Sequence, residues 1–510
     1  MSSYHQPLLQ LAMLVVLLLG AACNEDEFLD RTPFGGYTVN NFFETESQIT
    51  EAVTACYALA RGMYNGALWQ ANEFRSDNTT LQYNPNDRGG QATEEIDFFV
   101  LNSSSPIHGN IYNNVYSGIS RTNFIIDRID EAVFTEEANR PTREAEARFF
   151  RAFYHFIGVQ HFGDIVVLTE PISDDGTSLI GLQRQPVEDA YNQVILPDLA
   201  FAIENLPEEW NRTNVGRITK GAAQTLLAKA HFYRRDFTAA LPILNDIVAS
   251  QQYVLQDDFR SIFDPMNENN DEIIWATQFD AGANQGSGFF LNWLPYTSGT
   301  DLTDGIFIGS RAGLNMPTND LIRAYEPNDL RLEASIGFYD EDEEDPDNEL
   351  VPYIRKFFFP PIPVDGTDTD YPVFRYADVL LMQAEALLEV GGGLPNEVFE
   401  TLNRLRARAG LPFYFPGNPV PELDLSTTEQ LVEAVQRERR LELAFENYRW
   451  QDLVRYGTVE EVMVAHGEEQ KVTQAFFLDA FPDAYSQIRT LLAIPAEQVF
   501  LYNYRQNPGW

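Results

Sequence analysis

The sequence predicts a mainly α-helical protein whose helices pair as hairpins and are interrupted by a long, irregular, loop-rich insert with a few short strands. Apolar residues recur at helical spacing through most of the first half, and pairs of such segments separated by short turns occur in both halves. Between the pairs, residues 263–372 are rich in Gly, Pro and Asp and contain only short extended candidates. A hydrophobic content of 44% in 510 residues supplies enough material for a large core.

The N-terminus has the composition of a targeting segment. Residues 1–22 contain no Asp, Glu, Lys or Arg, and residues 8–19 are almost wholly apolar. This run is too short for a stable transmembrane anchor, which needs about 20 residues, and has the length of a secretory hydrophobic region. Three small residues then precede Cys23, a pattern that resembles the lipobox of bacterial lipoproteins. We expect a lipoprotein signal peptide over 1–22 and lipidation of Cys23; an ordinary signal peptide with an incidental Cys is the alternative.

Helical patterns follow in order along the body. In 144–160 the apolar side chains fall on one broad face of a 3.6-residue helix. The predicted helices cover 46–60, 111–129, 144–160, 187–205, 220–233, 237–250, 374–390, 396–409 and 428–446. Short strands are expected at 272–279 and 353–358.

Two of the helix pairs have the pattern of a tetratricopeptide-like hairpin. In the first pair, small Ala residues mark one face of 220–233, a short turn follows, and the next helix opens with an aromatic residue and Ala-Ala. The second pair is joined at residues 391–393, which are all Gly. Gly suits a helix C-cap because it reaches left-handed dihedral angles without a Cβ clash.

The charge of the chain excludes some classes of ligand. Against 35 Lys and Arg stand 76 Asp and Glu, which gives a net charge of −41. Such a body repels phosphate backbones at long range, so we expect no nucleic-acid partner. If Cys23 is lipidated, Cys56 has no partner and is expected to be a buried, small apolar side chain.

A search for catalytic and metal-binding patterns finds none that is specific. The phosphate-binding loop, the G-x-S-x-G elbow and the H-E-x-x-H zinc motif do not occur. His155 and His161 are six residues apart, which does not place them on one helical face. The acidic run 340–347 lacks the Gly of a calcium-binding loop and is expected to be solvated. We predict no metal and no cofactor, whereas a pair of hydrolytic carboxylates among 76 acids stays open.

Several charged residues of the second half are expected to form buried ion pairs that fix helix packing. The segment 437–443 alternates Arg and Glu at helical spacing. The residues assigned to ion pairs rather than to ligand contacts are Arg375, Asp378, Arg439, Glu442 and Arg449.

Seven blocks in order give the chain a resemblance to the SusD/RagB family of nutrient-binding outer-membrane lipoproteins. The blocks are Glu27-Phe28-Leu29-Asp30 with Pro33; RFFRAFYHFIGVQHFGDIVVLTEP at 148–171; GRITKGAA at 216–223; FRYADVLL at 374–381 with AEA at 384–386; 403–410; ERR at 438–440 with Glu442, Phe445-Glu446, Arg449-Trp450 and Asp452-Leu453; and Ile494-Pro495 with QNPGW at 506–510. Each block is weak alone, but their order along about 480 residues is specific.

The resemblance implies a fold, a function and a partner. It implies an N-terminal helical region over 23–262 and a C-terminal region over 263–510 that carries the insert, packed as one body. It also implies a lipid-anchored protein on the extracellular side of the outer membrane that binds a nutrient, expected to be an oligosaccharide. The protein would deliver that nutrient to a SusC-like TonB-dependent β-barrel transporter, without being an enzyme. The alternatives are a glycan-acting hydrolase and a tetratricopeptide-type protein-binding scaffold.

The resemblance also directs attention to two ligand-binding regions, an N-terminal loop and the insert. Sugar sites pair aromatic rings with amide or carboxylate hydrogen-bonding groups. Residues of these kinds in the two regions are Tyr64, Trp69, Asn72, Asp77, Tyr83, Asn292, Trp293 and Tyr296. Trp69 and Trp293 are the sharpest candidates, and Ala at either is expected to weaken glycan binding with little change in melting temperature. The alternative is that each Trp packs its own segment onto the body, and Asp77 could be a turn former.

Overall fold

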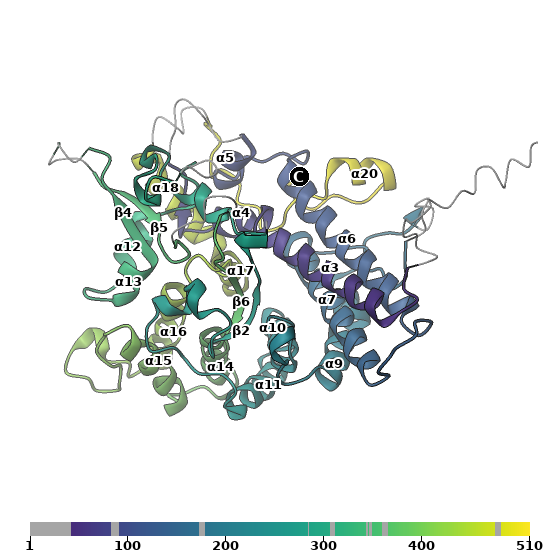
Figure 1. Ribbon diagram of the computed structural model, residues 1–510. Helices are drawn as coiled ribbons and strands as arrows, with labels where there is room; N and C mark the ends of the chain where they lie inside the picture. Colours follow the sequence, from purple (N-terminus) through teal and green to yellow (C-terminus); the bar gives the residue numbers. More distant parts are fainter. Residues whose placement is uncertain are drawn as a thin grey trace, which may run out of the picture.

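The computed structural model describes residues 42–82, 91–172, 179–283, 285–306, 312–342, 345, 349–359, 366–474 and 481–510. Over these residues the chain forms a helical body with three two-stranded antiparallel sheets (Figure 1). The predicted class, mainly helical with a few short strands, is confirmed. The signal peptide, Cys23 and Tyr83 lie outside the described residues.

Each helix that the periodicity predicts is present. In the first half the helices are α3 (Glu46–Tyr64), α4 (Ala67–Glu73), α5 (Gln91–Asp97), α6 (Pro106–Arg128), α7 (Asn139–Phe162), α8 (Val187–Ala190), α9 (Leu196–Asn205), α10 (Lys220–Tyr233) and α11 (Phe237–Ser250). In the second half they are α12 (Asn319–Ala324), α13 (Leu330–Ser335), α14 (Tyr376–Gly391), α15 (Asn396–Arg408), α16 (Thr428–Glu442), α17 (Arg449–Tyr456), α18 (Val459–Thr473) and α20 (Ala496–Tyr502). Of these, the structure adds α4, α5, α12, α13, α17, α18 and α20, which were not predicted.

Local chemistry sets where several helices begin and end. Thr45 and Thr427 each form a capping box, in which the Thr side chain accepts from the third helical residue and a Gln side chain returns the contact. Thr219 and Asp236 cap α10 and α11, and the side chain of each accepts one hydrogen bond from a backbone N–H of the first turn. Gly392 ends α14 with a φ of 61°, as predicted for the Gly run.

The strands account for two of the boundaries that the sequence misplaced. They are β1 (Thr79–Thr80), β2 (Ile273–Thr277), β3 (Met316–Pro317), β4 (Ile336–Tyr339), β5 (Val351–Ile354) and β6 (Tyr371–Arg375), which pair as β1–β3, β2–β6 and β4–β5. The helix predicted from 374 starts at 376, because the preceding residues pair with β2. The strand predicted at 353–358 is β5, which ends at 354 and is fixed by its pairing with β4.

Two predicted helices differ in other ways. The helix predicted at 428–446 ends at 442, and positive φ angles at Phe445 and Asn447 are incompatible with its continuation. The helix predicted at 187–205 contains one π-helical turn, Tyr191–Ile195, between α8 and α9.

Helix hairpins build the body. In Figure 1, α9, α10, α11, α14 and α15 follow one another along the lower part of the molecule, and β2 and β6 lie near its centre. α6 packs on α7, α10 on α11, and α11 in turn on α14, so the two predicted hairpins are neighbours in one array. The largest cluster of buried hydrophobic residues includes members from Ile49 to Tyr504. Cys56 belongs to it and is fully buried, as expected, and burial raises the pKa of its thiol to about 12.

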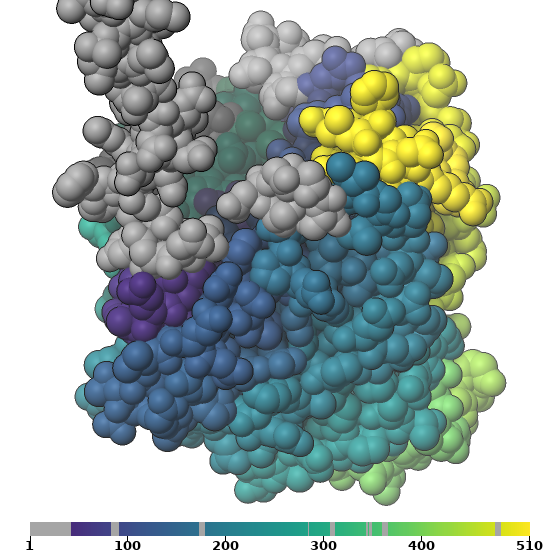
Figure 2. Space-filling view, turned by 90° about the vertical axis from the view of Figure 1, so that its right-hand side faces the viewer, coloured from purple at the N-terminus to yellow at the C-terminus, as the bar shows by residue number. Residues whose placement is uncertain are grey.

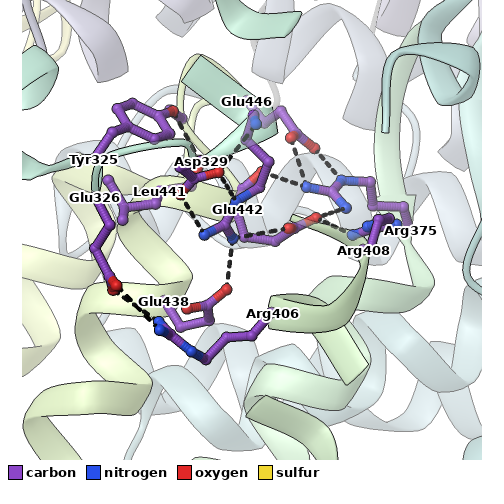
Figure 3. A network of polar contacts seen from close by, with 12 residues as sticks. Tyr325, Glu326, Asp329, Arg375, Arg406, Arg408, Glu438, Leu441, Glu442 and Glu446 are labelled. Atoms are coloured by element: carbon purple, nitrogen blue, oxygen red, sulfur yellow. Dashed lines mark hydrogen bonds and ion pairs between the residues drawn. The ribbon is translucent and has the colours of Figure 1, made fainter. Parts of the chain in front are cut away.

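A network of buried ion pairs joins the segments of the second half (Figure 3). The Arg375 guanidinium lies 2.7 Å from Glu446, 2.6 Å from Glu442 and 2.9 Å from Glu272, and none of these side chains is exposed. Glu442 also contacts Arg408 at 2.6 Å. Burial alone would raise the pKa of the Glu442 carboxyl, but the surrounding guanidinium groups hold it well below its usual range. β6, α15 and α16 are thereby fixed to one another.

A second group of ion pairs connects the two halves of the chain. Asp378 on α14 lies 2.7 Å from Lys229 on α10 and 2.6 Å from Arg439 on α16. Arg439 in turn contacts Asp452 on α17 at 2.8 Å. The prediction that Arg375, Asp378, Arg439 and Glu442 form buried ion pairs is confirmed.

Candidate ligand-binding site

The N-terminal segment and the insert, which are separated by more than 200 residues, lie side by side. β1 pairs with β3, with Thr79 opposite Pro317 and Thr80 opposite Met316. Just beyond β1, the backbone N–H of Gln82 donates to the carbonyl of Gly313 at 2.7 Å. Backbone hydrogen bonds therefore hold the end of the N-terminal segment against the insert.

Residues 313 and 314 of the insert also hold the segment that carries Asn292 and Trp293. The N–H of Gly313 donates to the carbonyl of Leu294 at 2.9 Å, and the N–H of Leu314 donates to the carbonyl of Asn292 at 2.9 Å. Residues 312–314 thus lie between 82 and 292–294. The two regions that the resemblance singled out meet at one place.

The two tryptophans are at this meeting point but are buried. Trp69 on α4 is 3% exposed and Trp293 is fully buried, and their ring centroids lie 5.3 Å apart in an edge-to-face arrangement. Phe289 and Phe357 pack around Trp293. This corrects the expectation of an open aromatic platform, because neither ring presents a face to solvent. The stated alternative describes both residues, since each packs its segment onto the body.

Three other candidates are also core residues. Tyr64 is 9% exposed and packs against Tyr371 at 5.2 Å, and Asn72 is 5% exposed. Asp77 forms two hydrogen bonds with Arg449, of 2.7 and 2.8 Å, and lies 2.9 Å from Arg440. Burial opposes ionisation, but the two guanidinium groups hold the pKa of Asp77 well below its usual range. Asp77 is therefore a structural carboxylate, and the ion-pair role predicted for Arg449 is confirmed.

The half-buried Tyr296, three residues after Trp293 in the sequence, belongs to a cluster of polar residues. Its backbone N–H donates to the side-chain oxygen of Gln82 at 2.9 Å, and the Gln82 amide donates to Glu341 at 2.8 Å. Thr297 donates to the same Glu341 carboxylate. The amide of Gln82 therefore links the N-terminal segment to two parts of the insert, at Tyr296 and at Glu341, the second residue after β4. We call Gln82, Asn292, Tyr296, Thr297 and Glu341 the junction cluster.

An open cleft of about 300 Å³ adjoins the junction cluster at Gln82. One wall comes from β1 and β3, a second from the start of β5, and a third from the end of α18. Gln470 and Gln474 line the third wall, and Gln474 donates to Thr80 and to the carbonyl of Leu81, each at 3.2 Å. Neutral amides, hydroxyls and the carboxylates of Glu349 and Glu469 therefore surround the cleft. This set of groups can bind hydroxyl groups of a ligand as donor and as acceptor.

Sequence reasoning missed Gln82, Glu341, Gln470 and Gln474. The only signal for Gln82 was its position next to Tyr83, which was a candidate. The other three lie in segments that contact Gln82 or Thr80 only through the tertiary fold.

The geometry offers little to a metal ion. Among the described residues, no group of three His, Cys, Asp or Glu side chains could hold one. His155 and His161 are buried on α7, and burial lowers their pKa values to about 4 and about 3. Of the acidic run, only Asp340, Glu341, Asp342 and Asp345 fall within the described residues.

The fold is a body of helical hairpins in which two distant segments of the chain meet. Comparison with protein-family models assigns the two halves of such a chain to one family. Residues 271–510 match the model of the SusD family, and residues 27–233 match a second family model, described as "Starch-binding associating with outer membrane". The chain belongs to the SusD/RagB family.

Relatives and solved structures agree with this assignment. SusD-like protein P25 of Formosa agariphila is 26% identical over 89% of this chain and 91% of its own length. A SusD homologue from Bacteroides thetaiotaomicron superposes with a TM-score of 0.76 at 21% identity, covering 92% of this chain and 98% of the homologue. A laminarin-binding SusD-like protein gives 0.73 at 24% identity over 92% and 100%. The two structures show a shared fold. Within the described residues, no helix is both long and apolar enough to cross a membrane.

Proposed function

We propose that this chain is a lipid-anchored outer-membrane protein that binds an oligosaccharide at the extracellular surface and delivers it to a SusC-like TonB-dependent transporter. It would act without catalysing a reaction on the glycan. The observation that carries the binding part is the meeting of the N-terminal segment and the insert at the junction cluster, beside an open polar cleft.

The chemistry of the junction cluster suits a sugar. A sugar ring has apolar C–H faces, which pack on aromatic rings, and hydroxyl edges, which need donors and acceptors. Tyr296 supplies a partly exposed ring, and Gln82, Asn292 and Glu341 supply polar groups beside it. Tyr83 follows Gln82 directly in the sequence, and we retain it as a proposed contact. The binding of laminarin by a structural relative supports a glycan as the ligand.

Binding at the junction cluster can be tested with a glycan array followed by titration of the best binder. Tyr296→Ala combined with Gln82→Ala should weaken binding at least about tenfold, because ring contact and hydrogen bonds are lost together. Phe413→Ala is the control, since that ring is 51% exposed in the loop after α15. Unchanged affinity in the double variant would place the site elsewhere, and release of shorter sugars by the purified chain would contradict a role without catalysis.

The proposed anchor can be tested with the two cysteines of the chain. Cys23→Ala should move the protein from the membrane fraction to the soluble fraction, because the lipid would be attached to that thiol. Cys56→Ala is the matched control and should stay in the membrane fraction, since Cys56 is a buried side chain. Retention of the Cys23 variant in the membrane would contradict the anchor.

Delivery to a transporter implies a stable complex. An interface of the obligate kind buries about 2,000 Å² or more, so the complex should survive mild detergent. Purification of the solubilised protein should recover a TonB-dependent β-barrel with it. Recovery of the chain alone in several mild detergents would argue against the partner.

A further inference from the structure

A second cleft, of about 510 Å³, lies in a different part of the molecule. Its walls come from α6, from the segments on both sides of 173–178, and from α20 with the residues that follow it. None of its lining residues belongs to the junction cluster or to the cleft beside it. In Figure 1, α20 and α6 lie on the opposite side of the molecule from β4 and β5, and Figure 2 shows the C-terminal segment against the N-terminal helices.

Four tyrosines line this cleft as two ring pairs from distant segments. Tyr502 and Tyr504 are stacked, with centroids 5.3 Å apart and an angle of 23° between their planes. Tyr112 and Tyr116 on α6 lie 4.5 Å apart at 40°. We call this cavity the tyrosine cleft.

The protein holds both ring pairs in place. The Tyr116 hydroxyl accepts from the N–H of Val166 at 2.9 Å and donates to the carbonyl of the same residue at 3.3 Å. Beyond the other pair, the Asn507 amide donates to the carbonyls of Phe162 at 2.9 Å and Leu492 at 2.7 Å. The end of the chain is therefore fixed to α7, and the cleft does not depend on a free C-terminal tail.

Most polar groups among the described lining residues of the cleft are neutral. Asn113, Ser117, Ser120 and Gln498 contribute amides and hydroxyls. Arg121 is the charged residue among the lining residues, and its guanidinium donates to the carbonyl of Ala55 at 3.1 Å. No Asp or Glu of the described residues lines the cleft, although the whole chain carries 76 of them. The described lining thus offers amide and hydroxyl groups that can bind hydroxyl groups of a ligand as donor and as acceptor.

We propose that the tyrosine cleft is a second carbohydrate-binding site, which takes about two or three residues of a neutral oligosaccharide. The partly exposed Tyr502 ring packs on a sugar face, and Asn113, Ser117 and Gln498 bind its hydroxyl groups. The choice of sugar as the ligand class rests on the proposed function, but the position of this site is independent of the junction cluster. Two sites on one chain would raise the affinity for a long glycan through multivalency.

Hydroxyl-radical footprinting of the detergent-solubilised full chain tests the two sites separately. The probes are short laminarin-derived and starch-derived oligosaccharides and the best binder from the glycan array. Bound glycan should protect Tyr502 from oxidation severalfold. That protection should persist in the variant that combines Tyr296→Ala and Gln82→Ala, which removes the first site only.

Variants of the cleft complete the test. Tyr502→Ala should weaken binding at this cleft at least about tenfold. Phe500→Ala removes an 86% exposed ring from α20, the helix that also carries Tyr502, and should leave the affinity of the cleft for the glycan unchanged. Ser117→Trp fills the cleft from an exposed position on α6, removes no packing, and should also abolish protection of Tyr502.

The outcomes separate this proposal from the function proposed above. Protection of the peptide around Tyr296 without protection of Tyr502, by any probe, overturns the second site and leaves the first intact. Protection of Tyr502 alone supports the second site and overturns the first. A chain that none of these glycans protects at either position overturns both.

Discussion

Glu73 shows how a single buried side chain couples this fold to pH. It is 1% exposed at the end of α4, and one of its oxygens accepts from the N–H of Asn447 at 2.6 Å. Its other oxygen has no hydrogen-bond partner within the described part of the chain. Burial raises the pKa of this carboxyl to about 7. The folded state therefore binds the proton more tightly than the unfolded state, so the stability from this group is present at low pH and is lost as the pH rises to about 7.

Glu73→Gln should remove this pH dependence, because the amide oxygen can still accept from Asn447 but the side chain does not titrate. Relative to the unchanged chain, the variant should gain free energy of unfolding between about pH 5 and about pH 8, by a few kcal/mol at most. Urea unfolding at the two pH values measures the difference. Glu51→Gln, at an exposed position on α3, is the control. An equal difference at both pH values would show that Glu73 ionises normally.

Trp293 directly follows Asn292 of the junction cluster and is a structural residue, so its removal should affect stability first. Trp293→Ala should lower the free energy of unfolding by about 3–5 kcal/mol, since a fully buried ring leaves a cavity against Trp69 and Phe289. Phe500→Ala should change it little, because that ring is 86% exposed. Denaturant unfolding of both variants measures the contrast, and a Trp293 variant as stable as the original chain would contradict the burial.

At the scale of elements, the crossing of α6 and α7 depends on a glycine. A Cβ at Gly118 would lie 2.3 Å from Tyr154 Cδ2. Tyr154 is fully buried, and its hydroxyl donates to the carbonyl of Cys56 at 2.7 Å, so the ring has no space to retreat. The absence of a side chain at 118 is what lets the two longest described helices approach each other here.

Two substitutions in α6 test this crossing against helix propensity. Gly118→Ala should destabilise the protein by about 1–3 kcal/mol through overpacking. Gly109→Ala in the same helix should stabilise it by about 0.5–1 kcal/mol, because no atom lies within 4 Å of the new Cβ and Ala favours the helix. Thermal melts of the two variants should shift in opposite directions. If both variants shifted the melting temperature in the same direction, either helix propensity alone or packing alone would govern both positions.

At the scale of the whole molecule, the N-terminal and C-terminal regions share one core. The largest hydrophobic cluster contains residues from both, and the ion pair between Asp378 and Lys229 crosses between them. Separate unfolding of either region would expose apolar surface and leave buried charges unpaired.

We therefore expect one cooperative heat-unfolding transition rather than two. Scanning calorimetry should give a calorimetric enthalpy equal to the van't Hoff enthalpy. Lys229→Met should lower the melting temperature of the single transition, because it leaves Asp378 with one partner fewer in the core. Two resolved transitions in the unchanged chain would show that the regions fold independently.

The sequence by itself determined the helices and much of the chemistry of the core. Periodicity and capping act over three or four residues, so α10, α11 and the Gly run after α14 are found where the local pattern predicts them. The ion-pairing residues Arg375, Asp378 and Glu442 could also be anticipated from the sequence and its resemblance to known blocks. Charged residues at core positions of a helix need partners, whichever segments supply them.

Only the tertiary structure decided which of the candidate ligand residues are buried in the core. Burial depends on which other segments pack against a residue. The sequence therefore could not separate Trp69 and Trp293, which pack on each other, from the half-buried Tyr296. The junction of Gln82 with Glu341 joins residues 259 positions apart. Tyr112 and Tyr504 likewise line one cleft only because distant segments pack together. No local pattern encodes such contacts, because they form only when separate elements are brought together by the shared core.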